Sequence, residues 1–275
     1  MTSQGLSDPR RDAKPFFQQH AVALFFVLAF AMFALLVPLA TLAGPLVLGL
    51  GTFAPAIAAF IVAGTTEGRT GIKALLGRIA IWRVGLRWYA SAIGIPLMAG
   101  VMTVLAAKAL GTQVTTQPIA LLMAPLFVLL AFGEEIGWRG FALPGLMQSH
   151  RPITAVLILG VVHALFHVPL WIAPGLTQPA YTFMSFVISS LCFSVVWTWL
   201  FMHARGSVLI ATFFHASINL FGNLFYLGIP SALLNWLMPA GYAIFAALIL
   251  ATNRHSFFVR KASTQAGDVE YVGNE

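Results

Sequence analysis

The sequence predicts an all-α protein, a polytopic bundle of about eight transmembrane helices with both termini in the cytoplasm. The 275-residue chain is 59% hydrophobic and 8% charged, with a mean hydropathy of +0.89, whereas a soluble domain carries roughly 25% charged residues. Eight apolar runs are long enough to cross a bilayer, which takes about 20 apolar residues. Basic residues lie in short groups between these runs, as is typical of membrane proteins.

The spans follow one another along most of the chain. Their expected ranges are 20–42, 45–64, 86–108, 119–147, 153–173, 181–202, 207–227 and 231–252. The first run is longer than the roughly 7–15 residues of a signal-peptide core, which favours an uncleaved anchor. We expect a polar N-terminal segment at 1–18, a single transmembrane domain at 19–252 with its catalytic core at about 119–225, and a polar, disordered tail at 253–275.

The distribution of charge supports an even number of spans. With both termini in the cytoplasm, nearly all basic residues between spans fall on the cytoplasmic side, and only Lys108 falls on the far side. An odd number of spans would break this pattern. The net charge of +7 therefore reflects membrane topology, and we expect no nucleic-acid partner. The basic segment at 65–87 is compatible with an amphipathic helix on the inner leaflet or with a connecting loop.

Two adjacent glutamates stand out inside the fourth span. Glu134 and Glu135 are the only acidic residues between Glu67 and Asp268, and charges inside spans are costly and usually functional. Glu135 and Arg139 are four residues apart and share a helix face, where they can form an ion pair. Glu134 points about 100° away, which leaves its carboxylate free to act as a general base. The alternative is a purely structural salt-bridge cluster.

Two further polar pairs occur at the same helical spacing. His163 and His167 in the fifth span match the spacing of zinc-binding histidine pairs, but without the glutamate of H-E-x-x-H. His215 and Asn219 in the seventh span could donate hydrogen bonds to an oxyanion or ligate a metal. Buried structural histidines, or hydrogen bonds between helices, are the alternatives. Convergence of the three pairs on one polar cavity would place a carboxylate and imidazoles around a water, as hydrolysis requires.

Three motifs in this order resemble the CPBP family, the CAAX proteases and bacteriocin-processing enzymes, which includes the type II CAAX prenyl proteases and is also called the abortive-infection family. The motifs read EEIGWR at 134–139, HALFH at 163–167 and HASIN at 215–219. The resemblance covers about residues 119–225. It departs from the family at His163, where the family usually has an aromatic residue.

The resemblance implies an intramembrane endopeptidase. It implies that Glu134 is the general base, which deprotonates a water that His167 helps to activate. It also implies that His215 and Asn219 stabilise the oxyanion, and that Glu135 and Arg139 support the site structurally. His163 is a supporting residue. The family has been described both as metal-free and as metal-dependent, so the expected cofactor is either none or a divalent metal such as zinc, held by Glu134, His167 and His215.

These expectations define the environment of the protein. Its partners are the lipid bilayer and a membrane-associated peptide or protein substrate, it is an integral multi-pass protein of the plasma (inner) membrane, and its cavity opens to the cytoplasm. A proton-coupled transporter and a non-catalytic immunity or scaffold protein on the same fold are the alternatives. The chain shows no internal repeat of the kind that many transporters have.

Overall fold

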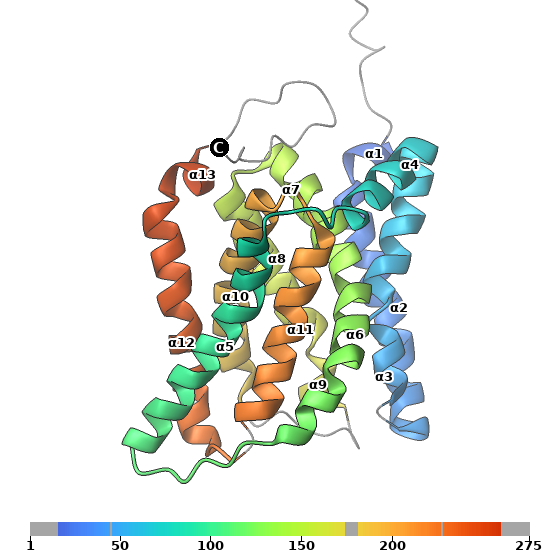
Figure 1. Ribbon diagram of the computed structural model, residues 1–275. Helices are drawn as coiled ribbons and strands as arrows, with labels where there is room; N and C mark the ends of the chain where they lie inside the picture. Colours follow the sequence, from blue (N-terminus) through green and yellow to red (C-terminus); the bar gives the residue numbers. More distant parts are fainter. Residues whose placement is uncertain (1–15, 45, 174–180, 227, 260–275) are drawn as a thin grey trace, which may run out of the picture.

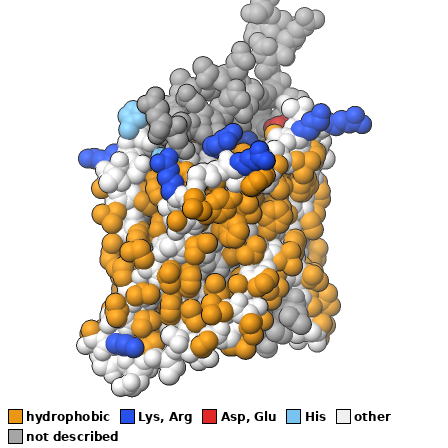
Figure 2. All heavy atoms as spheres, in the orientation of Figure 1, with side chains coloured by type: hydrophobic (Ala, Val, Ile, Leu, Met, Phe, Trp, Pro, Cys, Tyr) orange, Lys and Arg blue, Asp and Glu red, His pale blue; other side chains and the backbone are white. Residues whose placement is uncertain are grey.

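The computed structural model describes residues 16–44, 46–173, 181–226 and 228–259, and this part of the chain is almost entirely helical and contains no strand (Figure 1). Eight stretches within it are long and apolar enough to cross a membrane. The predicted class and the predicted number of spans are therefore confirmed. The helices stand side by side in a single bundle (Figure 1). On the face shown in Figure 2, apolar side chains predominate between the two ends of the bundle.

The spans are built from helices of different regularity. The regular ones are α2 (Ala21–Ala43), α5 (Leu86–Ala109), α10 (Phe183–His203), α11 (Val208–Phe225) and α12 (Ser231–Thr252). The second span combines α3 (Leu46–Gly51) with α4 (Ala54–Ile79), and the fifth combines α8 (Pro152–Phe166) with α9 (Pro169–Ile172). The fourth runs through η1 (Pro118–Met123), α6 (Ala124–Gly137), a π-helical turn η2 (Trp138–Ala142) and α7 (Leu143–Ser149).

The basic segment expected at 65–87 is mostly helical, with a short non-helical stretch at 80–85. Helix α4 continues to Ile79, with a sharp bend at Gly68, whose φ of 61° and ψ of −141° are non-helical. A positive φ is tolerated best by glycine, so this residue allows the chain to change direction. Beyond the bend, Leu75 is buried and the guanidinium of Arg78 donates to the carbonyl of Gly140 at 3.2 Å. The segment is thus anchored on the end of the bundle.

Both ends of the described chain lie at the same end of the bundle. Helix α1 (Phe16–Gln19) and helix α13 (Arg254–Phe258) both lie at this end, on opposite sides of the bundle (Figure 1), as an even number of spans requires. The ordered chain continues past the expected end of the domain at residue 252, because α13 packs the fully buried Phe257 against the bundle. Most of the expected N-terminal segment (1–15) and most of the expected tail (260–275) lie outside the described residues.

Glycines bring the glutamate-bearing helix close to its neighbour. Gly133 and Gly137 flank the glutamates, and both face the start of α4. A Cβ on Gly137 would lie 2.6 Å from the backbone carbonyl of Pro55, and one on Gly133 would lie 2.9 Å from the carbonyl of Thr52. Small residues allow such close helix contacts in membranes. This contact fixes the rotation of α6 about its axis, and with it the directions of Glu134 and Glu135.

Candidate active site

The predicted polar residues converge on one cavity inside the bundle. The cavity has a volume of about 300 Å³, and five of the predicted site residues line it: Glu134, His163, His167, His215 and Asn219. They come from α6, from α8 and its C-terminal end, and from α11. Glu134, His163 and His215 are nine-tenths or more buried. The remaining wall is mostly aromatic and aliphatic, so the cavity offers a few polar groups in an apolar enclosure.

Glu134 is held by a tryptophan one turn further along its own span. The indole Nε1–H of Trp138 donates to Oε2 of Glu134 at 3.2 Å. Trp138 is itself fully buried, with edge-to-face contacts to Phe25 and Phe166. The π-helical turn begins at this residue, and such turns are frequent at functional sites. Trp138 therefore fixes one carboxylate oxygen and leaves the other, Oε1, to the cavity.

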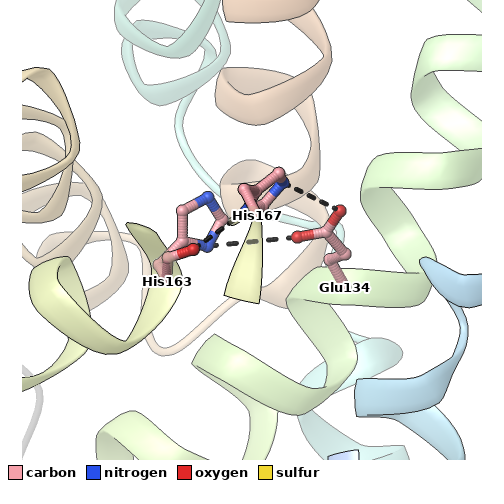
Figure 3. A group of neighbouring side chains, drawn as sticks. All are labelled: Glu134, His163 and His167. Carbon is pink, nitrogen blue, oxygen red and sulfur yellow. Dashed lines mark hydrogen bonds and ion pairs between the residues drawn. The ribbon is translucent and has the colours of Figure 1, made fainter. Parts of the chain in front are cut away.

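Glu134 faces two imidazoles, as Figure 3 shows. Nε2 of His167 lies 3.9 Å from Oε1, and Nδ1 of His163 lies 4.0 Å from Oε2. Nδ1 of His167 lies 2.9 Å from the carbonyl oxygen of His163. Because a carbonyl only accepts hydrogen bonds, this Nδ1 carries a proton, and Nε2 of the neutral ring presents a lone pair. Two acceptor atoms, Nε2 and Oε1, therefore face each other across a gap too long for a direct hydrogen bond.

The second glutamate belongs to a separate, fully buried network. Nη1 of Arg139 donates to both carboxylate oxygens of Glu135, at 3.0 and 3.1 Å, which is the ion pair expected from their spacing. The guanidinium also stacks on the ring of Trp197, 3.7 Å from its centroid. Nδ1 of His215 lies 2.9 Å from Oε1 of Glu135, so this carboxylate orients His215 and leaves its Nε2 free of that contact.

Asn219 lies one turn beyond His215 on α11 and lines the same cavity. Its backbone carbonyl accepts a hydrogen bond from the side chain of Asn223 at 2.9 Å. The expected face shared by His215 and Asn219 is therefore present in the structure. Two residues that the sequence interpretation left out complete the site, Trp138 and Trp197. The spacing of Glu134 and Trp138 was a usable signal for the first, whereas Trp197 comes from α10 and had no signal.

The residues that could hold a cation differ in one position from the expected set. Within the described residues, the donor atoms of Glu134, His163 and His167 lie within 4.8 Å of one another, and His215 is not part of this group. Nδ1 of His163 is buried and has no hydrogen-bond partner. Tetrahedral zinc with ligands at about 2.0–2.1 Å spaces them about 3.3 Å apart. The observed separations of 3.9 and 4.0 Å are slightly wider, which small side-chain rotations can close, so the donor set fits a divalent ion.

In the part of the chain that the structure describes, the cavity extends from the polar residues toward one end of the bundle. Its wall includes Gly49 in α3, Thr52 just after that helix, Leu170 and Trp171 on α9, and Tyr181. Helices α3 and α9 lie at the end opposite to α1 and α13 (Figure 1). The expectation placed the chain termini and the opening of the cavity on the same, cytoplasmic side. In the described residues, the cavity wall instead extends away from the end that carries α1 and α13.

Comparison with known proteins agrees with the resemblance seen in the motifs. Residues 116–221 match the family model described as type II CAAX prenyl endopeptidase Rce1-like. This segment, which is less than half of the chain, is similar to the CAAX proteases. The match contains all three motifs and nearly coincides with the region of resemblance at 119–225, so the family prediction is confirmed.

A curated relative gives the same result over part of its length. The CAAX prenyl protease 2 of Methanococcus maripaludis is 31% identical over 101 residues, which are 34% of this chain and 37% of the relative. The match therefore spans little more than a third of that relative. Within the matched segment, this chain has His163 at a position where the family usually has an aromatic residue. Nδ1 of His163 lies 4.0 Å from Oε2 of Glu134.

Proposed function

We propose that the protein is an intramembrane endopeptidase of the CAAX prenyl protease-like type, which hydrolyses a peptide bond with a water activated by Glu134 and His167. The observation that carries the proposal is the 3.9 Å gap between Nε2 of His167 and Oε1 of Glu134. A water in this gap can donate one hydrogen to each acceptor, at about 2.8 Å from both. Its oxygen lone pairs then face away from both groups, toward a substrate carbonyl.

Glu134 acts as the acid–base group of the proposed reaction. Glu134 takes a proton from the water, and the resulting hydroxide adds to the carbonyl carbon of the scissile bond. Glu134 then passes the proton to the leaving amine, as a general base becomes a general acid in the second half of such a reaction. A positioned acid–base group of this kind contributes typically 10²–10⁴-fold to the rate.

The oxyanion of the tetrahedral intermediate would be held from the α11 side. Asn219 can donate its amide N–H, and His215 can donate from Nε2 when its ring is doubly protonated, with Nδ1–H kept on Glu135. One such donor is worth about 10²–10³ in rate. Arg139 holds Glu135 in place, stacks on Trp197 and is almost fully buried outside the cavity lining, whereas Trp197 itself lines the cavity. The role of Arg139 is positioning.

A divalent ion is compatible with this site, and its use remains a proposal. The residues that would hold it are Glu134, His163 and His167. An ion bound there supplies Lewis acidity, which lowers the pKa of a bound water. The substrate class that the site supports is a membrane-associated peptide, because the polar groups sit in an aromatic and aliphatic cavity within the spans. Plasma-membrane localisation and a role in bacteriocin processing are part of the same proposal.

Glu134→Gln tests the proposed base, and Glu67→Gln is its matched control. Gln preserves the shape of the carboxylate but cannot accept the proton, whereas Glu67 is exposed and outside the cavity. Membrane proteomics of cells that make the parent chain or each variant would identify new peptide termini. We expect the termini produced by the parent to persist with Glu67→Gln and to disappear with Glu134→Gln at an unchanged level of folded protein. Cleavage that survives Glu134→Gln would show that Glu134 is not the base.

A further inference from the structure

The cavity and the basic end of the bundle face opposite ways. Of the ten lysines and arginines in the described residues, Arg139 is buried at the site and Lys108 lies in the last turn of α5, at the end where α3 and α9 lie. The other eight lie at the end that carries α1 and α13, where Figure 2 shows the basic side chains gathered. They are Arg69, Lys73, Arg78, Arg83, Arg87, Arg151, Arg205 and Arg254.

This asymmetry orients the bundle in a membrane. Short loops on the cytoplasmic side carry the excess of lysine and arginine, so the end with eight basic residues is the cytoplasmic one. The end with α3 and α9 then faces the extracytoplasmic side. The segments that connect the spans are short, which is the case in which the rule holds best.

Among the described residues, the site is closed toward the basic end, and its cavity continues toward the other end. The span between Glu134 and the basic end is tightly packed. Four of its residues, in α6, η2 and the start of α7, have at most 1% of their surface exposed: Glu135, Trp138, Arg139 and Leu143. From Glu134 toward α3 and α9, by contrast, the cavity wall continues through Thr52, Leu170 and Trp171. A molecule that reaches Glu134 from an aqueous face therefore passes the α3–α9 end.

We propose that the cavity receives its substrate from the extracytoplasmic side of the membrane, and that the substrate is an apolar segment of an exported or membrane-anchored peptide. The inference rests on the proposed function for the reaction itself, and on charge and cavity geometry for the direction. The lining favours apolar side chains, because Phe166, Trp171 and Phe186 surround the path to the polar groups. Water for the hydrolysis would enter by the same path.

Single cysteines can test the direction without any turnover. The background is Cys192→Ala, which removes the single natural cysteine. Thr52→Cys and Leu170→Cys report on the cavity wall, Lys108→Cys on the α3–α9 end, and Arg151→Cys on the basic end. Each variant is labelled with a membrane-impermeant maleimide, once in right-side-out spheroplasts and once in inside-out vesicles. Thermal unfolding in detergent confirms that each variant is folded, and either cavity position is sufficient if the other does not fold.

The expected labelling pattern is asymmetric. We expect the Thr52→Cys or Leu170→Cys variant, together with Lys108→Cys, to react in spheroplasts, and Arg151→Cys to react in inside-out vesicles. Cavity variants that react from the same side as Arg151→Cys, or a reversed pattern for the two end variants, would overturn the proposal. Because labelling requires no catalysis, such a result would leave the role of Glu134 untouched, and a failure of the Glu134→Gln experiment would leave the direction of the cavity untouched.

Discussion

His215 and Glu135 are joined across the bundle by a hydrogen bond of 2.9 Å between Nδ1 and Oε1. The same carboxylate is the ion-pair partner of Arg139, and Glu135 has no exposed surface. The adjacent glutamates therefore do different things. Glu135 ties α11 to the fourth span and orients a histidine, whereas Glu134 faces the cavity.

Glu135→Gln is expected to destabilise the protein strongly. It leaves the guanidinium of Arg139 buried without a counter-charge, and Nε and Nη2 of that side chain already have no hydrogen-bond partner within the described residues. Removing one partner of a buried ion pair costs typically about 3–5 kcal/mol. Thermal unfolding in detergent measures the loss.

The double variant Glu135→Gln/Arg139→Met is the control for the buried charge. With no charge left unpaired, we expect it to recover most of the lost stability, since neutral replacements of buried pairs are often tolerated. Proteolysis should not recover, because His215 has still lost its carboxylate. A single variant as stable as the parent chain would contradict the assigned role of Glu135.

Trp138→Phe is expected to reduce cleavage about 10- to 100-fold while the fold survives. The aromatic packing on Phe25 and Phe166 is largely kept, but the indole donor to Glu134 is lost. A hydrogen bond to a charged group is worth about 1.5–3 kcal/mol, and about 1.4 kcal/mol corresponds to a tenfold change in rate. The loss should appear in kcat rather than in KM, because the indole positions the base and does not line the cavity.

Trp88→Phe provides the matched control for this substitution. Trp88 is also buried, but its Nε1 has no hydrogen-bond partner in the described part of the chain. The same loss of an indole N–H should therefore leave cleavage close to that of the parent chain. Equal losses in both variants would indicate that general packing, and not the bond to Glu134, is responsible.

The proposed divalent-ion site is tested by His163→Phe, which is expected to abolish ion binding there. Phe restores the kind of residue that the family usually has at this position and deletes the buried, unpartnered Nδ1 4.0 Å from Glu134. After purification with zinc and dialysis, metal analysis should find about one zinc per parent chain, bound through three protein ligands, and a clear loss in the variant. His150→Phe, which changes a histidine outside the cavity, should retain the zinc. A parent chain without zinc, or equal zinc content in all three proteins, would contradict the cation site.

The residues that face one another along a single helix could be predicted from the sequence. Helical periodicity alone put Glu135 beside Arg139, His163 beside His167, and His215 beside Asn219, because side chains four residues apart lie on one face. The same rule also places Trp138 beside Glu134, although the sequence interpretation did not use it. Residues on different helices gave no comparable signal. Sequence placed His215 with Glu134 around a metal, whereas the structure pairs it with Glu135.

Hydrophobicity and local periodicity determined the eight spans and the polar pairs inside them, because each depends on neighbours in the chain and on the cost of burying charge in lipid. The span boundaries agree within a few residues except at the end of the second span, which was expected at residue 64 and continues as helix to Ile79. Tertiary structure alone decided which histidine meets which glutamate and toward which end the cavity extends. These depend on the rotation and packing of helices far apart in sequence, set by contacts such as that of Gly137 with Pro55 and by the positions of α3 and α9.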